Sequence, residues 1–241
     1  MECPADNLPM DQSQPDEPFA RRSSWIADTP PEGARAALHR LAAAMRQISD
    51  ALADMDAPEA DLLDAAIATE QIYQELEAAR TGHQSRGFAE SAVSGDTGAL
   101  VDRSPLLGLG NPIAPPLHLH VDGETVVGAA TFGRQYEGPP GNVHGGMIAA
   151  AFDEALGMVQ AMTGQPGMTG TLTIRYRQPT PLYREVTFRA WVESVSGRKI
   201  HARGTLHAGD TLCAEADGIF IVVDFERFRE ALSERGRPRP T

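Results

Sequence analysis

The stretch YEGPPGNVHGGMIAAAFDEALGM, residues 136–158, decides the fold, because a glycine and proline loop in it runs directly into an apolar helix. The run Gly-Pro-Pro-Gly at 138–141 cannot lie inside a helix or a central strand, since proline lacks an amide donor and glycine costs backbone entropy. Residues 146–163 are then apolar on nearly every side, which predicts a buried helix. The segment is too short and too polar at Asp153, Glu154 and Gln160 to span a membrane.

The amides of Gly145 and Gly146 fall in the first turn of this helix, where backbone donors have no acceptor inside the helix. The helix dipole also favours negative charge at that end. Two residues without side chains let a carbonyl group approach the amides closely, so the pattern predicts an oxyanion site. A plain turn or packing contact is the other interpretation of a glycine pair.

Asp153 lies among small and apolar neighbours on the predicted helix. A carboxylate in such surroundings either has a structural partner or has a raised pKa and acts as a base or nucleophile. Glu154 points about 100° away around the helix and is the competing candidate. Helix geometry leaves the choice between the two acids open.

The spacing of His144 and Asp153 indicates that the two residues can act together only if they come from two chains. Nine residues of helix correspond to roughly 2.5 turns and about 13 Å of rise, so the two residues point to opposite sides. If both act on one bond, Asp153 must come from a second chain, which predicts a two-fold dimer.

Several motifs in order resemble one enzyme family. The HGG at 144–146 is followed by Asp153 in an alanine-rich helix, then by IRYRQPTPL from residue 174 and SGRKIHARGTL from residue 196. This set resembles the PaaI-like hotdog acyl-CoA thioesterases over residues 104–223, about half of the chain. In many relatives an asparagine stands six positions before the HGG histidine, whereas this chain has Gly138 there and an asparagine only at Asn142.

The resemblance implies a role for each matching residue. The Gly145 amide would receive the thioester oxygen with Gly146 close by, and His144 would position or polarise that end of the site. Asp153 of the partner chain would activate water or attack directly, assisted by the Thr169 hydroxyl. The turn with Arg198 and Lys199, the only lysine of the chain, would meet the phosphates of coenzyme A; a solvated hairpin tip is the other interpretation. Arg134, Arg175 and Arg177 are weaker candidates for the same role.

The alternation of apolar and polar residues predicts the rest of the fold. Residues 117–133 form two strands around the turn pair Asp122-Gly123, and four more strands are expected at 168–178, 184–195, 199–208 and 211–223. A hairpin, a helix and a meander give an α+β protein whose antiparallel sheet wraps around one helix. This is the hotdog architecture that the resemblance implies.

Composition divides the chain into five parts. We predict a disordered acidic tail at 1–30, a helical hairpin extension at 31–80, a linker at 81–103, the hotdog domain at 104–224, and a short helix with a basic tail at 225–241. The apolar residues of SPLLGLGNPIAPP, from residue 104, suggest an arm packed on the domain.

Charge and cysteine content exclude several classes of function. The net charge is −12, and the first hundred residues supply nearly all of it, with 18 acidic residues against seven basic ones. This acidity argues against nucleic acid as a partner. Cys3 and Cys213 cannot form a disulfide framework and no signal peptide is recognisable, so a cytoplasmic protein is expected.

No cofactor is expected. His118 with His120, and His201 with His207, alternate onto one face of their strands, but no cysteine or carboxylate stands at a spacing that would complete a metal site. The serines lack the surroundings of a nucleophile elbow.

The sequence therefore predicts hydrolysis of acyl-CoA thioesters by a homodimer or a dimer of dimers. A hotdog protein that binds acyl-CoA without cleaving it, as a sensor or scaffold, is the alternative. A hotdog hydratase is disfavoured, because Met158 stands where its histidine would follow Asp153. The acyl group and the choice of Asp153 as base or nucleophile stay open.

Overall fold

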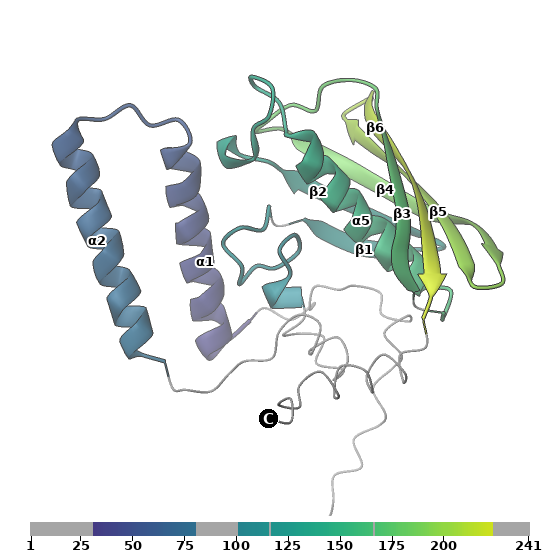
Figure 1. Ribbon diagram of the computed structural model, residues 1–241, viewed down its shortest axis with the longest axis horizontal. Helices are drawn as coiled ribbons and strands as arrows, with labels where there is room; N and C mark the ends of the chain where they lie inside the picture. Colours follow the sequence, from purple (N-terminus) through teal and green to yellow (C-terminus); the bar gives the residue numbers. More distant parts are fainter. Residues whose placement is uncertain (1–30, 81–100, 116, 166, 224–241) are drawn as a thin grey trace, which may run out of the picture.

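The structure is a computed structural model that describes residues 31–80, 101–115, 117–165 and 167–223 (Figure 1). The predicted tail at 1–30, most of the linker at 81–103 and the predicted helix and tail at 225–241 lie outside the described residues. The boundaries of the five predicted parts therefore stay a prediction.

Six strands form one antiparallel sheet in the order β1-β2-β4-β5-β6-β3. Their bounds are β1 His118–Asp122, β2 Thr125–Thr131, β3 Gly167–Tyr176, β4 Glu185–Ser196, β5 Lys199–Ala208 and β6 Thr211–Val222. Each predicted strand is present and ends within two residues of its expected limits, because turn residues separate the alternating runs. Within the described residues, β1 and β3 are the two edges of the sheet.

The first hairpin turns one residue later than expected. Asp122 pairs with Thr125, so Gly123 and Glu124 form the turn, and Gly123 has the positive φ of 59° that a tight hairpin needs. The dipeptide Asp122-Gly123 predicts the hairpin correctly, but the turn lies one position further along the chain.

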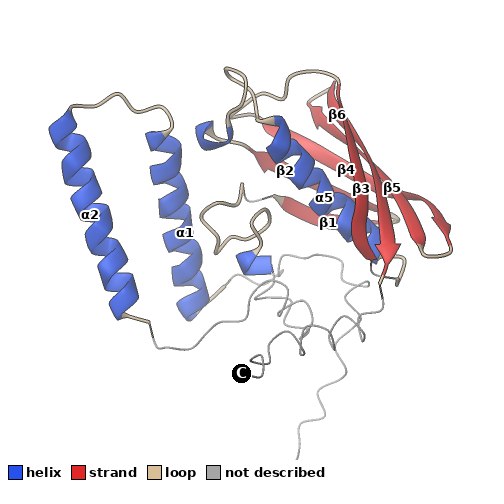
Figure 2. Cartoon of the chain, viewed as in Figure 1, coloured by secondary structure: helices blue, strands red, loops and turns tan. Residues whose placement is uncertain are grey.

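Helix α5, Gly145–Ala161, lies across one face of the sheet (Figure 2). Phe152 from the helix and Phe188 from β4 are both buried and pack edge to face, with ring centroids 5.4 Å apart. Gly204 of β5 lets the helix approach, since a Cβ there would lie 3.2 Å from the Phe152 ring. A sheet wrapped around one long apolar helix is the hotdog fold that the sequence predicts.

Residues 101–115 pack as an arm against this domain. Ser104 is fully buried, and Leu107 joins the core beside the sheet. The predicted linker reached Arg103, but Val101 and Asp102 are buried, so the arm begins earlier than expected.

Two helices precede the arm, α1 at Gly33–Leu52 and α2 at Glu59–Ala78. Figure 1 shows α1 beside the domain and α2 beyond it. Helix α1 buries Ala42, while α2 has no buried residue at all. The heptad-like spacing predicted both helices but not this packing. No described helix is long and apolar enough to cross a membrane.

Candidate active site

The glycine and proline loop is a tight turn that sets the start of α5. The Gly138 amide donates to the Asn142 carbonyl at 2.9 Å, and Gly141 has a φ of 73°, which favours glycine. The Val143 amide donates to the Thr180 carbonyl at 2.8 Å, which ties the loop to the segment after β3. The helix therefore begins at a fixed place against the sheet.

His144 caps the helix with its own side chain. Its Nδ1 accepts a hydrogen bond from the Gly146 amide at 3.0 Å, so a neutral imidazole carries its proton on Nε2. The Gly146 amide is thereby occupied. The Gly145 amide has no acceptor among the described residues, and the Gly145 carbonyl accepts from the Tyr176 hydroxyl at 2.7 Å. One amide, rather than two, is left to receive an oxyanion.

A hollow of about 390 Å³ opens beside this amide. Its walls include Gly145, Ile148, Asn142, Tyr176 and Arg177, and none of the described carboxylates lines it. Asn142 lies at its rim with its side-chain amide donating to the Pro140 carbonyl at 2.8 Å. The hollow can thus bind a carbonyl oxygen next to apolar side chains, but it contains no general base of its own.

Asp153 lies elsewhere on the same helix. The Thr169 hydroxyl of β3 donates to Asp153 Oδ1 at 2.8 Å, which joins two residues that the sequence placed in one site. Asp153 is half-buried and Thr169 is exposed, next to the free edge of the sheet. This carboxylate faces outward, where another chain can reach it.

Glu154, the competing acid, points under the arm instead. Its carboxylate accepts from the Ser104 hydroxyl at 3.3 Å, and burial raises its pKa to about 7, with a smaller contribution from the Asp153 charge. Both acids are half-buried, but Glu154 bonds to the arm and Asp153 bonds to the edge strand β3, so the structure separates an inward acid from an outward one.

Comparisons with known proteins place this geometry in a family. The profile described as "Thioesterase superfamily" matches residues 140–215, from the loop before α5 to the middle of β6. The crystal structure of a thioesterase superfamily protein is 33% identical, with a TM-score of 0.72, and the match covers 84% of this chain and 98% of that one. The chain belongs to the thioesterase superfamily.

Curated relatives of this superfamily domain match a shorter region. Acyl-coenzyme A thioesterase THEM4 of Bos taurus is 36% identical over 97 residues, which is 39% of this chain and 40% of the relative. Acyl-coenzyme A thioesterase THEM5 of Homo sapiens is 29% identical over 96 residues, 39% of each chain. The chain thus matches about 40% of the length of these curated relatives.

The match to the solved superfamily structure reaches beyond the hotdog domain. Residues 101–223 are only about half of the chain, so a likeness over 84% of it includes part of the N-terminal region. The likeness to this superfamily protein therefore extends into the first hundred residues of the chain.

The departure at Gly138 has a steric cause. A Cβ at this position would lie 2.7 Å from the Cα of His144, so the backbone leaves no room for an asparagine side chain. In this member of the thioesterase superfamily the loop runs closer to the helix start than a side chain at 138 permits.

The turn with Arg198 and Lys199 lies away from the helix tip, whereas Arg177 lines the hollow beside Gly145. The Arg198 guanidinium donates to the Val222 carbonyl at 3.0 Å. Lys199 pairs with Ile221 near the end of β6, whereas Tyr176, next to the hollow, pairs with Ala214 near its start. Seven strand residues separate these pairs along β6, roughly 23 Å. Within one chain the turn does not reach the Gly145 amide.

The weaker candidates are all paired with carboxylates. Arg175 binds Asp217 at 3.0 Å and Arg177 binds Glu215 at 2.6 Å. Arg134 binds Asp54 and Glu137, each at 2.9 Å. Ion pairs within the chain account for these three side chains.

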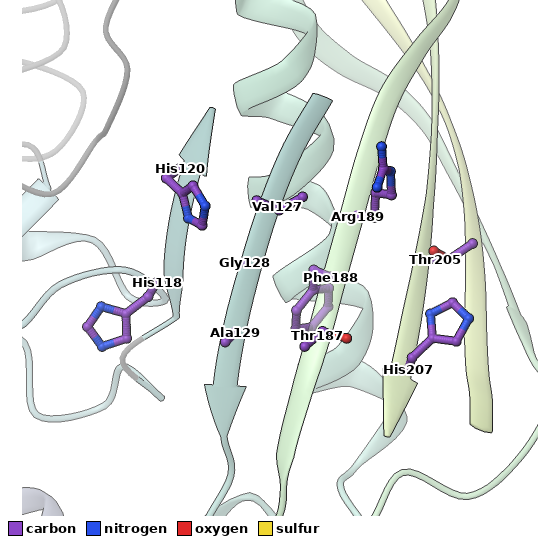
Figure 3. A pocket seen from close by; sticks show the side chains of 10 residues that line it. All are labelled: His118, His120, Val127, Gly128, Ala129, Thr187, Phe188, Arg189, Thr205 and His207. Atoms are coloured by element: carbon purple, nitrogen blue, oxygen red, sulfur yellow. The ribbon is translucent and has the colours of Figure 1, made fainter. Parts of the chain in front are cut away.

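The histidines lie on the outer face of the sheet, away from α5. Figure 3 shows His118 and His120 on β1 and His207 on β5, separated by β2 and β4. Among the described residues, no group of three or more histidine, cysteine or acidic side chains is arranged to hold a metal ion.

Proposed function

We propose that this protein hydrolyses acyl-CoA thioesters. The observation that carries the proposal is the Gly145 amide, which lies at the positive end of α5 beside a hollow with apolar and polar walls and has no acceptor among the described residues. The curated relatives that match this region are named acyl-coenzyme A thioesterases, which supports the same activity. We also propose that the protein is a member of the PaaI-like subfamily.

The reaction needs a carboxylate that the hollow lacks. Asp153 and its partner Thr169 lie beside β3, an edge strand that pairs only with β6 among the described strands. Two chains related by a two-fold axis can pair their β3 edges, which brings Asp153 of the partner towards the hollow. The site is then shared between two subunits.

In this arrangement the thioester oxygen binds the Gly145 amide, which stabilises the negative charge that develops during attack. The His144 ring carries its proton on Nε2 and polarises or positions the same end of the substrate. The carboxylate of Asp153 takes a proton from a water held by Thr169, or it attacks the carbonyl carbon itself to form an anhydride that water then opens. Either route releases the free acid and the thiol of coenzyme A and uses no cofactor.

The same dimer gives Arg198 and Lys199 a role. Because β3 edges paired about a two-fold axis run antiparallel, the far end of the partner's sheet lies towards the hollow. These two cations can then meet the phosphates of coenzyme A from the partner chain. The buried free thiol of Cys213 fits a reducing compartment, and a cytoplasmic location is part of the proposal.

Thiol release from a panel of acyl-CoA substrates tests the proposal. We expect turnover by the full chain and a loss of about 100- to 10,000-fold in Asp153→Asn, since that is the usual contribution of a general base. Glu154→Gln is the matched control and keeps its turnover, because Glu154 faces the arm. Tight coenzyme A binding without thiol release across the panel would favour the sensor function instead. Incorporation of ¹⁸O from water into Asp153 distinguishes the nucleophile from the base.

A further inference from the structure

Helix α1 is fixed to the domain by polar contacts near both of its ends. Near its start Arg35 and His39 bind the Asp102 carboxylate of the arm, at 2.5 and 2.8 Å. In its last turn the Asp50 carboxylate accepts a hydrogen bond from the Arg134 amide. The end of α1 is thereby held against the segment that precedes the glycine and proline loop.

The Asp50 contact is made at a turn of 3₁₀ helix, η2 at Arg134–Tyr136. The first amides of a helical turn have no acceptor inside it, and here the carboxylate from α1 supplies one across 84 positions of the chain. The Tyr183 hydroxyl also donates to this carboxylate, at 3.4 Å. Glycine at position 133 makes the approach possible, because a Cβ there would collide with the Asp50 side chain. The end of α1 therefore caps η2.

The end of η2 and the residue after it hold the glycine and proline loop at two points. The Tyr136 carbonyl accepts from the His144 amide at 2.8 Å, and the Glu137 carboxylate accepts from the Gly141 amide at 2.6 Å. Tyr136 is buried, and its ring packs edge to face on Phe132 with ring centroids 5.8 Å apart. Because this side chain is fixed in the core, the position of η2 decides where the loop and His144 lie.

A short path of contacts joins α1 to the start of α5. The three residues of η2, with one hydrogen bond at each end, separate Asp50 from His144. His144 is the cap of α5, and the Gly145 amide follows it directly. An oxyanion donor is effective because it already points to the place where negative charge develops. A misplacement of about 1 Å can cost about 100-fold in rate, so the support of His144 bears directly on catalysis.

We propose that the end of α1 positions the oxyanion donor of the active site, with Asp50 and Glu137 as positioning residues. Asp50 fixes η2 from the helical extension, and Glu137 fixes the loop between η2 and α5. The inference rests on the proposed thioester hydrolysis, in which the Gly145 amide receives the thioester oxygen. It gives the helical extension a role in the reaction, since α1 completes the support of a donor that lies in the hotdog domain.

Asp50→Ala in the full chain tests the contact from α1. We expect kcat for thiol release to fall about tenfold with KM within about twofold of the wild type, because the donor acts in the transition state. Asp50→Asn keeps an oxygen acceptor for the Arg134 amide and should restore kcat. Asp54→Ala is the matched control, since Asp54 lies just beyond the same end of α1 but binds the Arg134 guanidinium rather than its amide. An equal loss of kcat in Asp50→Asn or in Asp54→Ala would refute the role of this contact.

Hydrogen exchange of the His144 amide measures the positioning without any turnover. This amide donates to the Tyr136 carbonyl, and we expect it to exchange about tenfold faster in Asp50→Ala than in the wild type. The Ala202 amide in the buried centre of β5 should keep its rate. An unchanged His144 rate, or an equal acceleration at Ala202, would overturn the positioning role. A wild type that releases no thiol would instead overturn the proposed hydrolysis, and the exchange rates would still decide whether α1 holds His144.

Glu137→Ala tests the second contact without a change in α1. It removes the acceptor of the Gly141 amide, so we expect a fall in kcat of about tenfold and little change in KM. Glu137→Gln keeps an oxygen that can accept from the same amide and should retain most of the wild-type kcat. Full activity of Glu137→Ala, or an equal loss in Glu137→Gln, would exclude Glu137 as a positioning residue.

Discussion

At the residue scale, the proposed chemistry depends on one backbone amide. The Gly146 amide is bonded to His144, so the Gly145 amide is the donor at the helix tip that stays free for a substrate among the described residues. Two substitutions at Gly145 can therefore distinguish the effect of losing the amide donor from the effect of changing the shape of the site.

Gly145→Pro removes this donor at the first position of the helix, where proline is tolerated. We expect kcat to fall by about 100- to 1000-fold, the usual loss for one oxyanion donor. Gly145→Ala is the matched control, because its Cβ also meets the Tyr176 ring, at 3.1 Å, but its amide remains. Equal activity of the two variants, measured by thiol release, would remove the amide from the mechanism.

Glu154 gives a prediction on stability and pH. Burial raises its pKa from 4.5 to about 7. Between these two pH values the carboxyl group ionises readily in the unfolded chain but only at a free-energy cost in the folded protein. Stability is highest where the group is protonated and declines as the pH rises from about 4.5 to 7. Glu154→Gln should therefore be more stable than the wild type at pH 8, by up to about 3 kcal/mol, and similar at pH 4.5. Urea unfolding at both pH values measures this, with the exposed Glu124→Gln as control; no gain at pH 8 would contradict a buried charge.

The sequence predicted the outward acid better than the inward one. Asp153 and Thr169 are both identified by the resemblance, and the structure joins them at 2.8 Å. Helix geometry alone could not separate Asp153 from Glu154, because the partner of Glu154 is Ser104, fifty residues earlier in the chain. The hydrogen bond that occupies the Gly146 amide depends on the rotamer of His144. The spacing of residues in the sequence does not predict that rotamer.

At the element scale, strands were easier to predict than the packing of the first two helices. Turn residues mark the limits of β3 to β6, and burial alternates along β5 as the sequence does. For α1 the apolar spacing predicts a helix, but the ion pairs of Arg35 and His39 with Asp102 decide its orientation. Contacts between residues more than sixty positions apart cannot be read from local periodicity.

Asp102 should anchor α1. Burial opposes its ionisation, but hydrogen bonds from Arg35 and His39 outweigh this and lower its pKa below 3.8. Its contribution is therefore present at neutral pH and is lost as the pH falls through the lowered value. We expect Asp102→Asn to cost about 2 kcal/mol at pH 7, the usual value of hydrogen bonds to a charged group. Thermal unfolding and hydrogen exchange of α1 amides measure the effect.

Asp54→Asn is the control for this anchor, since Asp54 pairs with Arg134 at an exposed position. Surface pairs contribute little, so its stability should stay within about 0.5 kcal/mol of the wild type. Equal losses in the two variants would show that Asp102 has no special role in holding α1.

At the scale of the whole molecule, one chain holds the two halves of the proposed site in different places. No carboxylate from the described part of the chain lines the hollow beside Gly145, and Asp153 faces outward beside the edge strand β3. The proposed two-fold dimer, expected from the spacing of His144 and Asp153, would bring the halves together. A hotdog domain of this kind is therefore proposed to act as a pair.

Subunit complementation tests this central claim most directly. Asp153→Asn and Gly145→Pro homodimers should each be almost inactive, because each lacks one half of both sites. In a mixed dimer with a shared site, one site has both defects and the other has none. An equal random mixture should thus recover about a quarter of the wild-type thiol release. A mixture that forms mixed dimers but stays inactive would contradict a site built from two subunits.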